Sequence, residues 1–481
     1  MNEIERKKKE KYDAVEEIYE EKKVWVFFDE LNTCKSMDLL SEIICKHSCQ
    51  GESLPENIYF IGAVNPYRKS KQKKVGLKIN KNENYEEPDL IYTVNPLPHS
   101  LLNFVFDFGN LNPEDEKSYI KNIVEEKIKE KNLSELATKL IFISQNFIRK
   151  NNGNSSVSLR EIRRFIIFYE FFINYLKIRK ENIITEKTIE NDEIKYSLLN
   201  EEQIKLYSIN LSIYLGYYLR LTEFDYKNDN LDQKGLRVIL YEELNKIFIE
   251  KSNIDFLKIP NLEENFIADN VELEKGIAKN RALLENLFSL FVAINTKIPI
   301  FIIGKPGTSK TLSVQLINNA MKGNLSTNSF FRKYPKMYVS TYQGALNSTS
   351  EGVKAIFKKA RKILEVNKEK ISSIYFDEMG LAEHSPHNPL KVLHSELEYD
   401  LNENNKKISF IGVSNLSLGS AKMNRGLAIN IPELNERDIK NTSITIAKSY
   451  LGEKLINNIE AFFENLGSSY FKYKQELKKI I

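Results

Sequence analysis

One pattern occurs twice in this chain, about 350 residues apart. In each copy an acidic pair follows an apolar stretch, and a second apolar stretch further along the chain ends in Asn. The polar residues of the two copies are Asp29, Glu30 and Asn65, and then Asp377, Glu378 and Asn415. The separation from Asp to Asn is 36 residues in the first copy and 38 in the second. This agreement predicts a repeated α/β module in which the two strands of each copy end in polar side chains.

A loop with two glycines precedes the second copy and runs from Gly304 to Thr311. It follows the short apolar run 298–303 and precedes the apolar-rich stretch 312–320, so we expect a buried strand, a loop and a helix. Glycines let the main chain curl, and a helix N-terminus carries partial positive charge, so this loop predicts phosphate binding. The predicted nucleotide-binding residues are Gly304, Pro306, Gly307, Thr308, Ser309, Lys310, Thr311 and Asp377.

The residue types at these positions indicate ATP chemistry. Lys310 is expected to reach the β and γ phosphates of ATP, and Thr311 and Asp377 to supply oxygen ligands to Mg²⁺. Glu378 is expected to polarise the water that attacks the γ-phosphate. Asn415 is predicted to act as a polar sensor between Mg²⁺ and the γ-phosphate, with an ordinary turn residue as the alternative.

Ser309 stands where the usual phosphate-loop pattern has its second glycine. A serine fits there without strain when its backbone keeps a negative φ angle. We therefore expect a negative φ at Ser309.

Strands and helices are expected to alternate from about residue 275 onward, which predicts the α/β class with a parallel sheet flanked by helices. Helix-start signals at Asn112-Pro113 and a capping box at Ser158–Glu161 predict a helical lid after the first copy. The expected divisions are a partial core at 1–111, a helical lid at 112–180, a helical insert or linker at 181–261, a complete core at 262–434 and the start of a second lid at 435–481.

Composition excludes several classes of partner. The 70 basic and 66 acidic residues nearly cancel, so no electrostatic footprint for nucleic acid or a membrane surface is expected. The longest apolar segment, 165–178, is interrupted by Glu170 and Asn174 and is too short for a membrane span. Three cysteines are too few for a disulfide framework. We expect a soluble cytoplasmic protein.

Five segments of the chain together resemble one known family. They are Val24–Cys34, Asn65–Arg68, Gly304–Thr311, Gly380–Glu383 and Ala421–Gly426. The chain resembles mysterin, a family of giant AAA+ proteins that are also ubiquitin ligases and carry six AAA units in a dynein-like ring. The resemblance implies AAA+ modules matching the third and fourth units, ATP with Mg²⁺ as cofactors, and other AAA+ modules and the ubiquitin machinery as partners. It also implies a possible association with lipid droplets.

The departures from this family are informative as well. The first copy has no phosphate loop and is degenerate in this sense, and three cysteines do not suffice for a RING domain. We therefore expect an interior segment of a longer protein. Arg160 is placed like a lid arginine that touches nucleotide, and Arg425 like an arginine finger for the first module. A surface ion pair for Arg160 and a structural cation for Arg425 remain the alternatives.

The preferred hypothesis is an AAA+ segment in which the second module binds and hydrolyses ATP. A nucleotide-binding scaffold without turnover is the alternative, because the arginine that completes the second module would come from a following module. A small-molecule kinase is disfavoured by Glu378 directly after Asp377 and by the repeated pattern.

Overall fold

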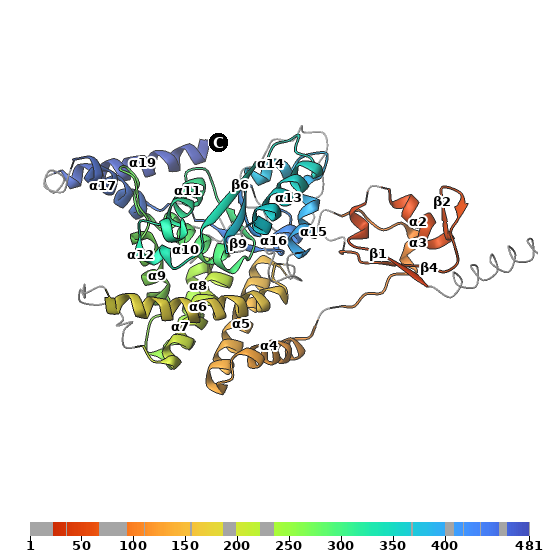
Figure 1. The fold of residues 1–481 in the computed structure, drawn as a ribbon, viewed down its shortest axis with the longest axis horizontal. Coiled ribbons are helices and arrows are strands. Elements are labelled where there is room, and N and C mark those ends of the chain that lie inside the picture. Colours follow the sequence, from red (N-terminus) through yellow and green to blue (C-terminus); the bar gives the residue numbers. More distant parts are fainter. Residues whose placement is uncertain are drawn as a thin grey trace, which may run out of the picture. The chain divides into compact units, whose positions relative to one another are not determined.

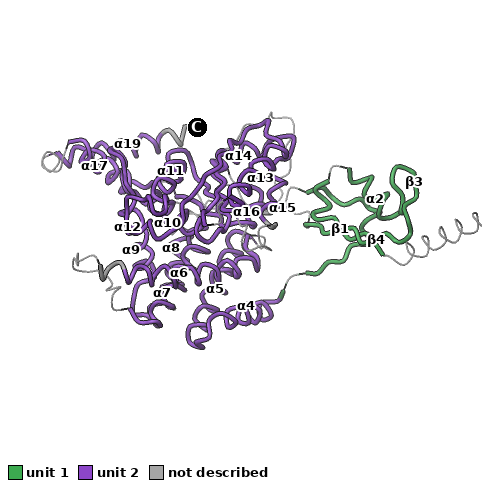
Figure 2. The backbone as a smooth tube through the Cα atoms, viewed as in Figure 1, with its two compact units in different colours: residues 1–71, 82–111 green, residues 72–81, 112–481 purple. Residues whose placement is uncertain are grey.

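The computed structural model describes residues 23–34, 36–66, 94–109, 111–153, 156–185, 199–221, 235–366, 369–399, 408–416, 418–432, 434–451 and 459–480. The chain divides into two compact units (Figure 2). Unit 1 comprises residues 1–71 and 82–111, and unit 2 comprises residues 72–81 and 112–481.

Unit 1 is built on two parallel strands, in which Val24 lies opposite Ile58 and Phe28 opposite Gly62. A small apolar core of Leu31, Met37 and Leu101 packs beside them. The elements of this unit are β1 (Val24–Phe28), η1 (Leu31–Thr33), α2 (Met37–Lys46), β2 (Ser48–Cys49), β3 (Glu52–Ser53), β4 (Ile58–Gly62) and α3 (His99–Leu102).

Unit 2 contains a five-stranded sheet with the order β6-β7-β8-β5-β9. Its strands are β5 (Ile300–Ile303), β6 (Met337–Gln343), β7 (Ile371–Asp377), β8 (Ser409–Ser414) and β9 (Leu427–Asn430). All the neighbouring pairs are parallel. Strands β5 and β8 are buried along their whole length, as expected where helices cover both faces of a parallel sheet. The predicted α/β class with a parallel sheet is confirmed.

Helices lie on both faces of this sheet (Figure 1). On one face α10 (Arg281–Thr296) and α11 (Lys310–Ala320) join the larger apolar core. On the other face α13 (Ser350–Val366), α14 (Met379–Glu383) and α15 (Val392–Tyr399) enclose a second core around Phe376 and Phe410. The short elements between them are η4 (Gly323–Leu325), α12 (Ser329–Arg332), η5 (Pro389–Lys391) and α16 (Ser420–Met423).

Seven further elements in the described part of unit 2 share the larger core with the sheet, namely α4 (Pro113–Lys127), α5 (Lys131–Asn152), α6 (Arg160–Thr185), α7 (Glu201–Ile213), the π-helical turn η3 (Tyr214–Tyr218), α8 (Leu236–Ser252) and α9 (Lys258–Asp269). Near the C-terminus, α17 (Glu436–Leu451) and α19 (Glu460–Ile480) pack together through a separate small cluster of Ile444, Ala447 and Phe463. The Asn112 side chain caps α4 by accepting a hydrogen bond from the Asp115 N–H at 2.8 Å. Helix α6 packs against α10 through the stacked rings of Phe172 and Phe288.

A buried ion pair ties the helices to the end of the sheet. The Arg237 guanidinium on α8 and the Glu285 carboxylate on α10 are each 1% exposed and lie 2.8 Å apart. Arg237 also donates to the carbonyls of Leu221, at 2.8 Å, and Asn430, at 2.9 Å. One side chain therefore links two helices, the segment after η3 and strand β9, and a buried charge of this kind is tolerated because it is paired and hydrogen-bonded.

Glu264 makes the stability of unit 2 depend on pH. Burial, and then the nearby charge of Glu285, raises the pKa of Glu264 to about 8. The folded chain therefore keeps a proton that the unfolded chain releases between pH 4.5 and about 8, so this group lowers the unfolding free energy as pH rises through that interval. Glu264→Gln should remove this contribution and be at least as stable as wild type at pH 8, measured by urea unfolding between pH 5 and pH 8.

The exposed Glu272 supplies the matched control, because Glu272→Gln should leave the pH dependence unchanged. Equal slopes of unfolding free energy against pH in wild type and Glu264→Gln would contradict the assignment of the proton to Glu264.

Candidate functional site

Three of the sequence motifs meet at one edge of the five-stranded sheet. Strand β5 lies between β8 and β9, with Ile303 opposite both Ser414 and Asn430. The phosphate loop begins directly after β5, Asp377 ends β7, and Asn415 follows β8. All the strands are parallel, so these ends share the carboxyl edge, where open α/β sheets bind their ligands.

Lys310 is the first residue of α11 and is almost fully buried. Its Nζ donates to the carbonyls of Gly304, at 2.7 Å, and Lys305, at 2.8 Å, so the side chain curls into its own loop. Burial lowers the pKa of Lys310 to about 8, while the charges of Glu378 and Asp377 act in the opposite direction. The ammonium group is thus held inside the loop that was predicted to bind phosphate.

Ser309 adopts the left-handed backbone conformation, with φ of 56°, so the expectation of a negative φ is wrong. That conformation costs a residue with a Cβ about 1–2 kcal/mol. Local hydrogen bonds offset the cost, because the Ser309 carbonyl accepts from the Ser313 N–H at 2.9 Å and from the Ser313 hydroxyl at 2.6 Å. Ser309 directly precedes α11, so this left-handed turn joins the loop to the helix.

Asn286 on α10 is a loop contact that sequence analysis missed. Its Nδ2 donates to the Thr308 carbonyl at 3.0 Å. The Thr308 hydroxyl donates in turn to the Lys305 carbonyl at 2.8 Å. A single Asn on an apolar helix gives no local signal of such a contact, because its partner lies 22 residues further along the chain.

Thr311 and Asp377, the predicted Mg²⁺ ligands, come from two elements at the same edge: Thr311 is the second residue of α11, and Asp377 is the last residue of β7. Burial raises the pKa of Tyr375, two residues before Asp377, above its usual range. The Asp377 Oδ1 accepts from the Glu378 N–H at 2.9 Å. A hydroxyl and a carboxylate oxygen at this edge form a donor set that suits Mg²⁺, which prefers oxygen ligands and keeps several waters.

Glu378 and Asn415 contact each other directly. The Asn415 Nδ2 lies 3.0 Å from one carboxylate oxygen of Glu378 and 3.1 Å from the other. Glu378 has a φ of 47°, which turns the chain sharply after β7. A carboxylate has further lone pairs beyond those that face this amide, so Glu378 can still accept a hydrogen bond from water.

Gly344, directly after β6, is a second residue that sequence analysis missed. Its N–H donates to the Asp377 carbonyl at 2.8 Å. A Cβ at this position would lie 2.4 Å from the Glu378 carbonyl oxygen and 3.1 Å from that of Asp377. The absence of a side chain therefore lets the end of β6 approach the acidic pair.

Gly344→Ala should displace the acidic pair, because a Cβ 2.4 Å from a backbone oxygen forces a main-chain shift. We expect a loss of about 1–3 kcal/mol of unfolding free energy, typical of overpacking, measured by urea unfolding. Gly216→Ala is the control, since a Cβ there has no neighbour within 4 Å. Equal losses in the two variants would contradict a specific clash at Gly344.

The first copy has the same register as the second. Phe28 lies opposite Gly62 in unit 1, and Phe376 lies opposite Gly412 in unit 2, so the acidic pair and the Asn follow at the same offsets in both. Glu30 has a φ of 49°, close to that of Glu378.

The contacts of Asn65 differ from those of Asn415. The Asn32 Nδ2 donates to the Asn65 carbonyl at 2.7 Å, and the Asn65 N–H donates to the Asn32 Oδ1 at 3.2 Å. Asp29 directly follows β1, as Asp377 ends β7. The two copies therefore share their strand register, but Asn65 and Asn415 make different hydrogen bonds.

The two candidate arginines lie in unit 2. Arg425, in the turn between α16 and β9, donates from Nη1 to the His394 carbonyl on α15 at 3.3 Å. Arg160 is exposed at the start of α6, and its N–H donates to the Ser158 hydroxyl at 3.3 Å. The lid and finger roles of these residues stay predictions.

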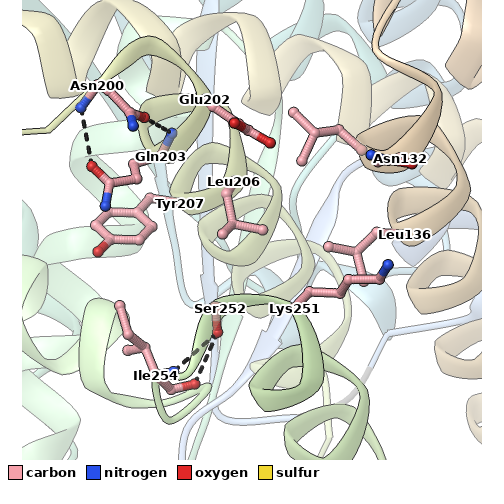
Figure 3. Close-up of a pocket in the computed structure, with 11 residues that line it drawn as sticks. Asn132, Leu136, Asn200, Glu202, Gln203, Leu206, Tyr207, Lys251, Ser252 and Ile254 are labelled. Atoms are coloured by element: carbon pink, nitrogen blue, oxygen red, sulfur yellow. Dashed lines mark hydrogen bonds between the residues drawn. The ribbon is translucent and has the colours of Figure 1, made fainter.

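A cavity of about 300 Å³ lies among helices α5, α7 and α8 (Figure 3). Its lining contains no residue of the phosphate loop. Two of its polar side chains, Asn200 and Gln203, satisfy each other's backbone N–H groups in a capping box. These contacts serve the start of α7, and no ligand class follows from the cavity.

A parallel sheet with a phosphate loop, an acidic strand end and a polar strand end at one edge defines a P-loop module of the AAA+ class. Residues 276–438 match the family model described as the RNF213 AAA domain. The chain belongs to the mysterin family, to which the RNF213 proteins belong.

The relatives are much longer than this chain. The chain is 30% identical over 477 residues to human "E3 ubiquitin-protein ligase RNF213", covering 92% of the chain and 9% of that protein. It is 30% identical over 458 residues to zebrafish "E3 ubiquitin-protein ligase rnf213-beta", covering 88% of the chain and 8% of that protein. A solved structure titled "Structure of C. elegans PCH-2" aligns with 38% of the chain and 50% of its own, at 17% identity and a TM-score of 0.27.

No helix in the described part of the chain has both the length and the apolar character to cross a bilayer.

Proposed function

We propose that the second module binds Mg-ATP and hydrolyses it. The observation that carries the proposal is the meeting of Lys310, Asp377 and the Glu378–Asn415 pair at the carboxyl edge of one parallel sheet. Each residue type there has a task in phosphoryl transfer, namely charge stabilisation, metal ligation and positioning of water.

The residues of the chain divide the work as follows. Backbone N–H groups of the loop and of the start of α11 hold the phosphates, and Lys310 exchanges its two carbonyl partners for phosphate oxygens. Glu378 accepts a hydrogen bond from the attacking water, and Asn415 fixes the orientation of that carboxylate. Thr311 and Asp377 would hold Mg²⁺, which neutralises charge on the phosphate oxygens when bound.

The wider role follows from the family. We propose that the two modules correspond to the third and fourth AAA units of the longer relatives, and that the segment works with neighbouring AAA+ modules in the cytoplasm. The ubiquitin ligase activity in the relatives' printed name is proposed for this protein only as the activity with which the ATPase is associated. The three cysteines of this chain do not provide a ligase domain of their own.

The test is a pair of measurements on the 481-residue chain. Calorimetric titration with Mg-ATP measures binding, and phosphate release at saturating ATP measures turnover. We expect both. Binding without phosphate release would replace this proposal by a nucleotide-binding scaffold, and absence of binding would contradict both functions.

A further inference from the structure

Asn286 is a wholly buried amide whose hydrogen bond leaves its own helix. Its Nδ2 crosses to the Thr308 carbonyl in the phosphate loop, whereas Asn295 on the same helix donates to the Phe291 carbonyl of α10 itself. Helices α10 and α11 lie side by side (Figure 1), so the bond links the helix before β5 to the loop that starts α11.

This contact sets the direction of a phosphate-binding donor. The Thr308 carbonyl and the Ser309 N–H belong to one planar trans peptide unit, in which the C=O and N–H bonds point in opposite directions. When Asn286 holds the carbonyl toward the buried helix α10, the Ser309 N–H is turned to the other side of that peptide. An N–H group held in one direction at the start of a helix is available to donate to an anion, as the N–H groups of phosphate-binding loops do.

The same contact lies next to the strained residue. Ser309 follows Thr308 directly and has a φ of 56°, a conformation that glycine adopts freely and serine does not. Strained backbone persists where the surrounding structure over-determines it. Asn286 supplies such a constraint from outside the loop.

Stability alone does not explain an amide at this position. The Asn286 Oδ1 is buried and has no hydrogen-bond partner among the described residues. An unsatisfied buried acceptor lowers the stability of the fold. The Asn286 side chain therefore has an unfavourable contribution from Oδ1 as well as the favourable hydrogen bond from Nδ2 to the loop.

We propose that Asn286 is a positioning residue for nucleotide binding, which holds the Thr308–Ser309 peptide in its phosphate-facing orientation and so compensates for serine in place of glycine. The inference rests on the proposed ATP binding and deepens it. Asn286 itself makes no contact with the nucleotide in this scheme.

The experiment is a double-mutant cycle on ATP affinity in the full chain. Asn286→Ala should weaken ATP binding about tenfold, as expected for one lost hydrogen bond. Asn286→Ala should cost much less affinity in a Ser309→Gly background than in wild type, since glycine needs no external constraint at positive φ, and the Ser309→Gly variant alone gives the reference affinity for that background.

Asn295→Ala is the matched control and should bind ATP as wild type does, because its amide bonds within α10. Thermal melting of every variant separates affinity from folding. The inference is overturned if Asn286→Ala binds like wild type, or if it costs as much affinity in the Ser309→Gly background as in wild type. Absence of binding by wild type itself would instead contradict the proposed function on which the inference rests.

Discussion

Replacing Lys310 by Ala should weaken ATP binding by on the order of 100-fold or more. The Nζ group is already held inside the loop by two carbonyls, and each charge-assisted bond to phosphate contributes about 1.5–3 kcal/mol. Calorimetric titration with Mg-ATP measures the loss. Lys322→Ala, which removes the same charge from an exposed position just after α11, should bind like wild type.

The affinity of wild type should also depend on pH in a definite direction. Burial lowers the pKa of Lys310 to about 8, whereas phosphate requires the protonated ammonium group. Above pH 8 a proton must be taken up on binding, so affinity should fall as pH rises past this value. A Lys310→Ala variant that binds ATP as tightly as wild type, or with the same pH profile, would show that Lys310 does not contact phosphate.

Glu378→Gln should separate binding from turnover. The amide oxygen of Gln can still accept the hydrogen bond from Asn415, so the loop and the affinity for ATP should change little. Gln is a poor base, and loss of a positioned base typically costs about 10²–10⁴-fold in rate. Phosphate release at saturating Mg-ATP should fall by that factor while the dissociation constant stays within a few-fold of wild type.

Glu365→Gln, on the exposed part of α13, is the control for loss of a carboxylate that lies away from the site. This variant should release phosphate at the wild-type rate. Wild-type turnover in Glu378→Gln would remove Glu378 from the reaction. If wild type itself binds ATP without releasing phosphate, the result supports the alternative function, a nucleotide-binding scaffold without turnover. In that case Glu378 has no catalytic role.

Much of the sheet and its edge is predictable from sequence because the signals are local. The apolar run that contains β5 and the loop from Gly304 to Thr311 are contiguous, and the acidic pair and Asn415 each end a strand. The 36- and 38-residue spacings also predict two similar strand pairs, and β1–β4 and β7–β8 have the same register. These features need no knowledge of distant neighbours.

The missed features depend on contacts between distant segments. Ser309 has a positive φ because the start of α11 and a contact from another helix constrain it, and the residue type alone favours a negative φ. Gly344 approaches Glu378 only once β6 and β7 are paired, and Asn286 approaches Thr308 only once α10 packs beside the loop. Spacing along the chain does not encode such contacts.

The aromatic contact between α6 and α10 bears on how short a working fragment can be. Phe288 and Phe291 of α10 are wholly buried; Phe288 stacks on Phe172 of α6, and Phe291 meets Phe171 of α6 edge to face. Expression of residues 276–438 alone, the range of the family match, would remove the α6 rings from Phe288 and Phe291 and would remove Arg237 from Glu285. We therefore expect the smallest stably folded fragment that carries the second module to extend well upstream of the motif-bearing range, into the helices that begin at Pro113.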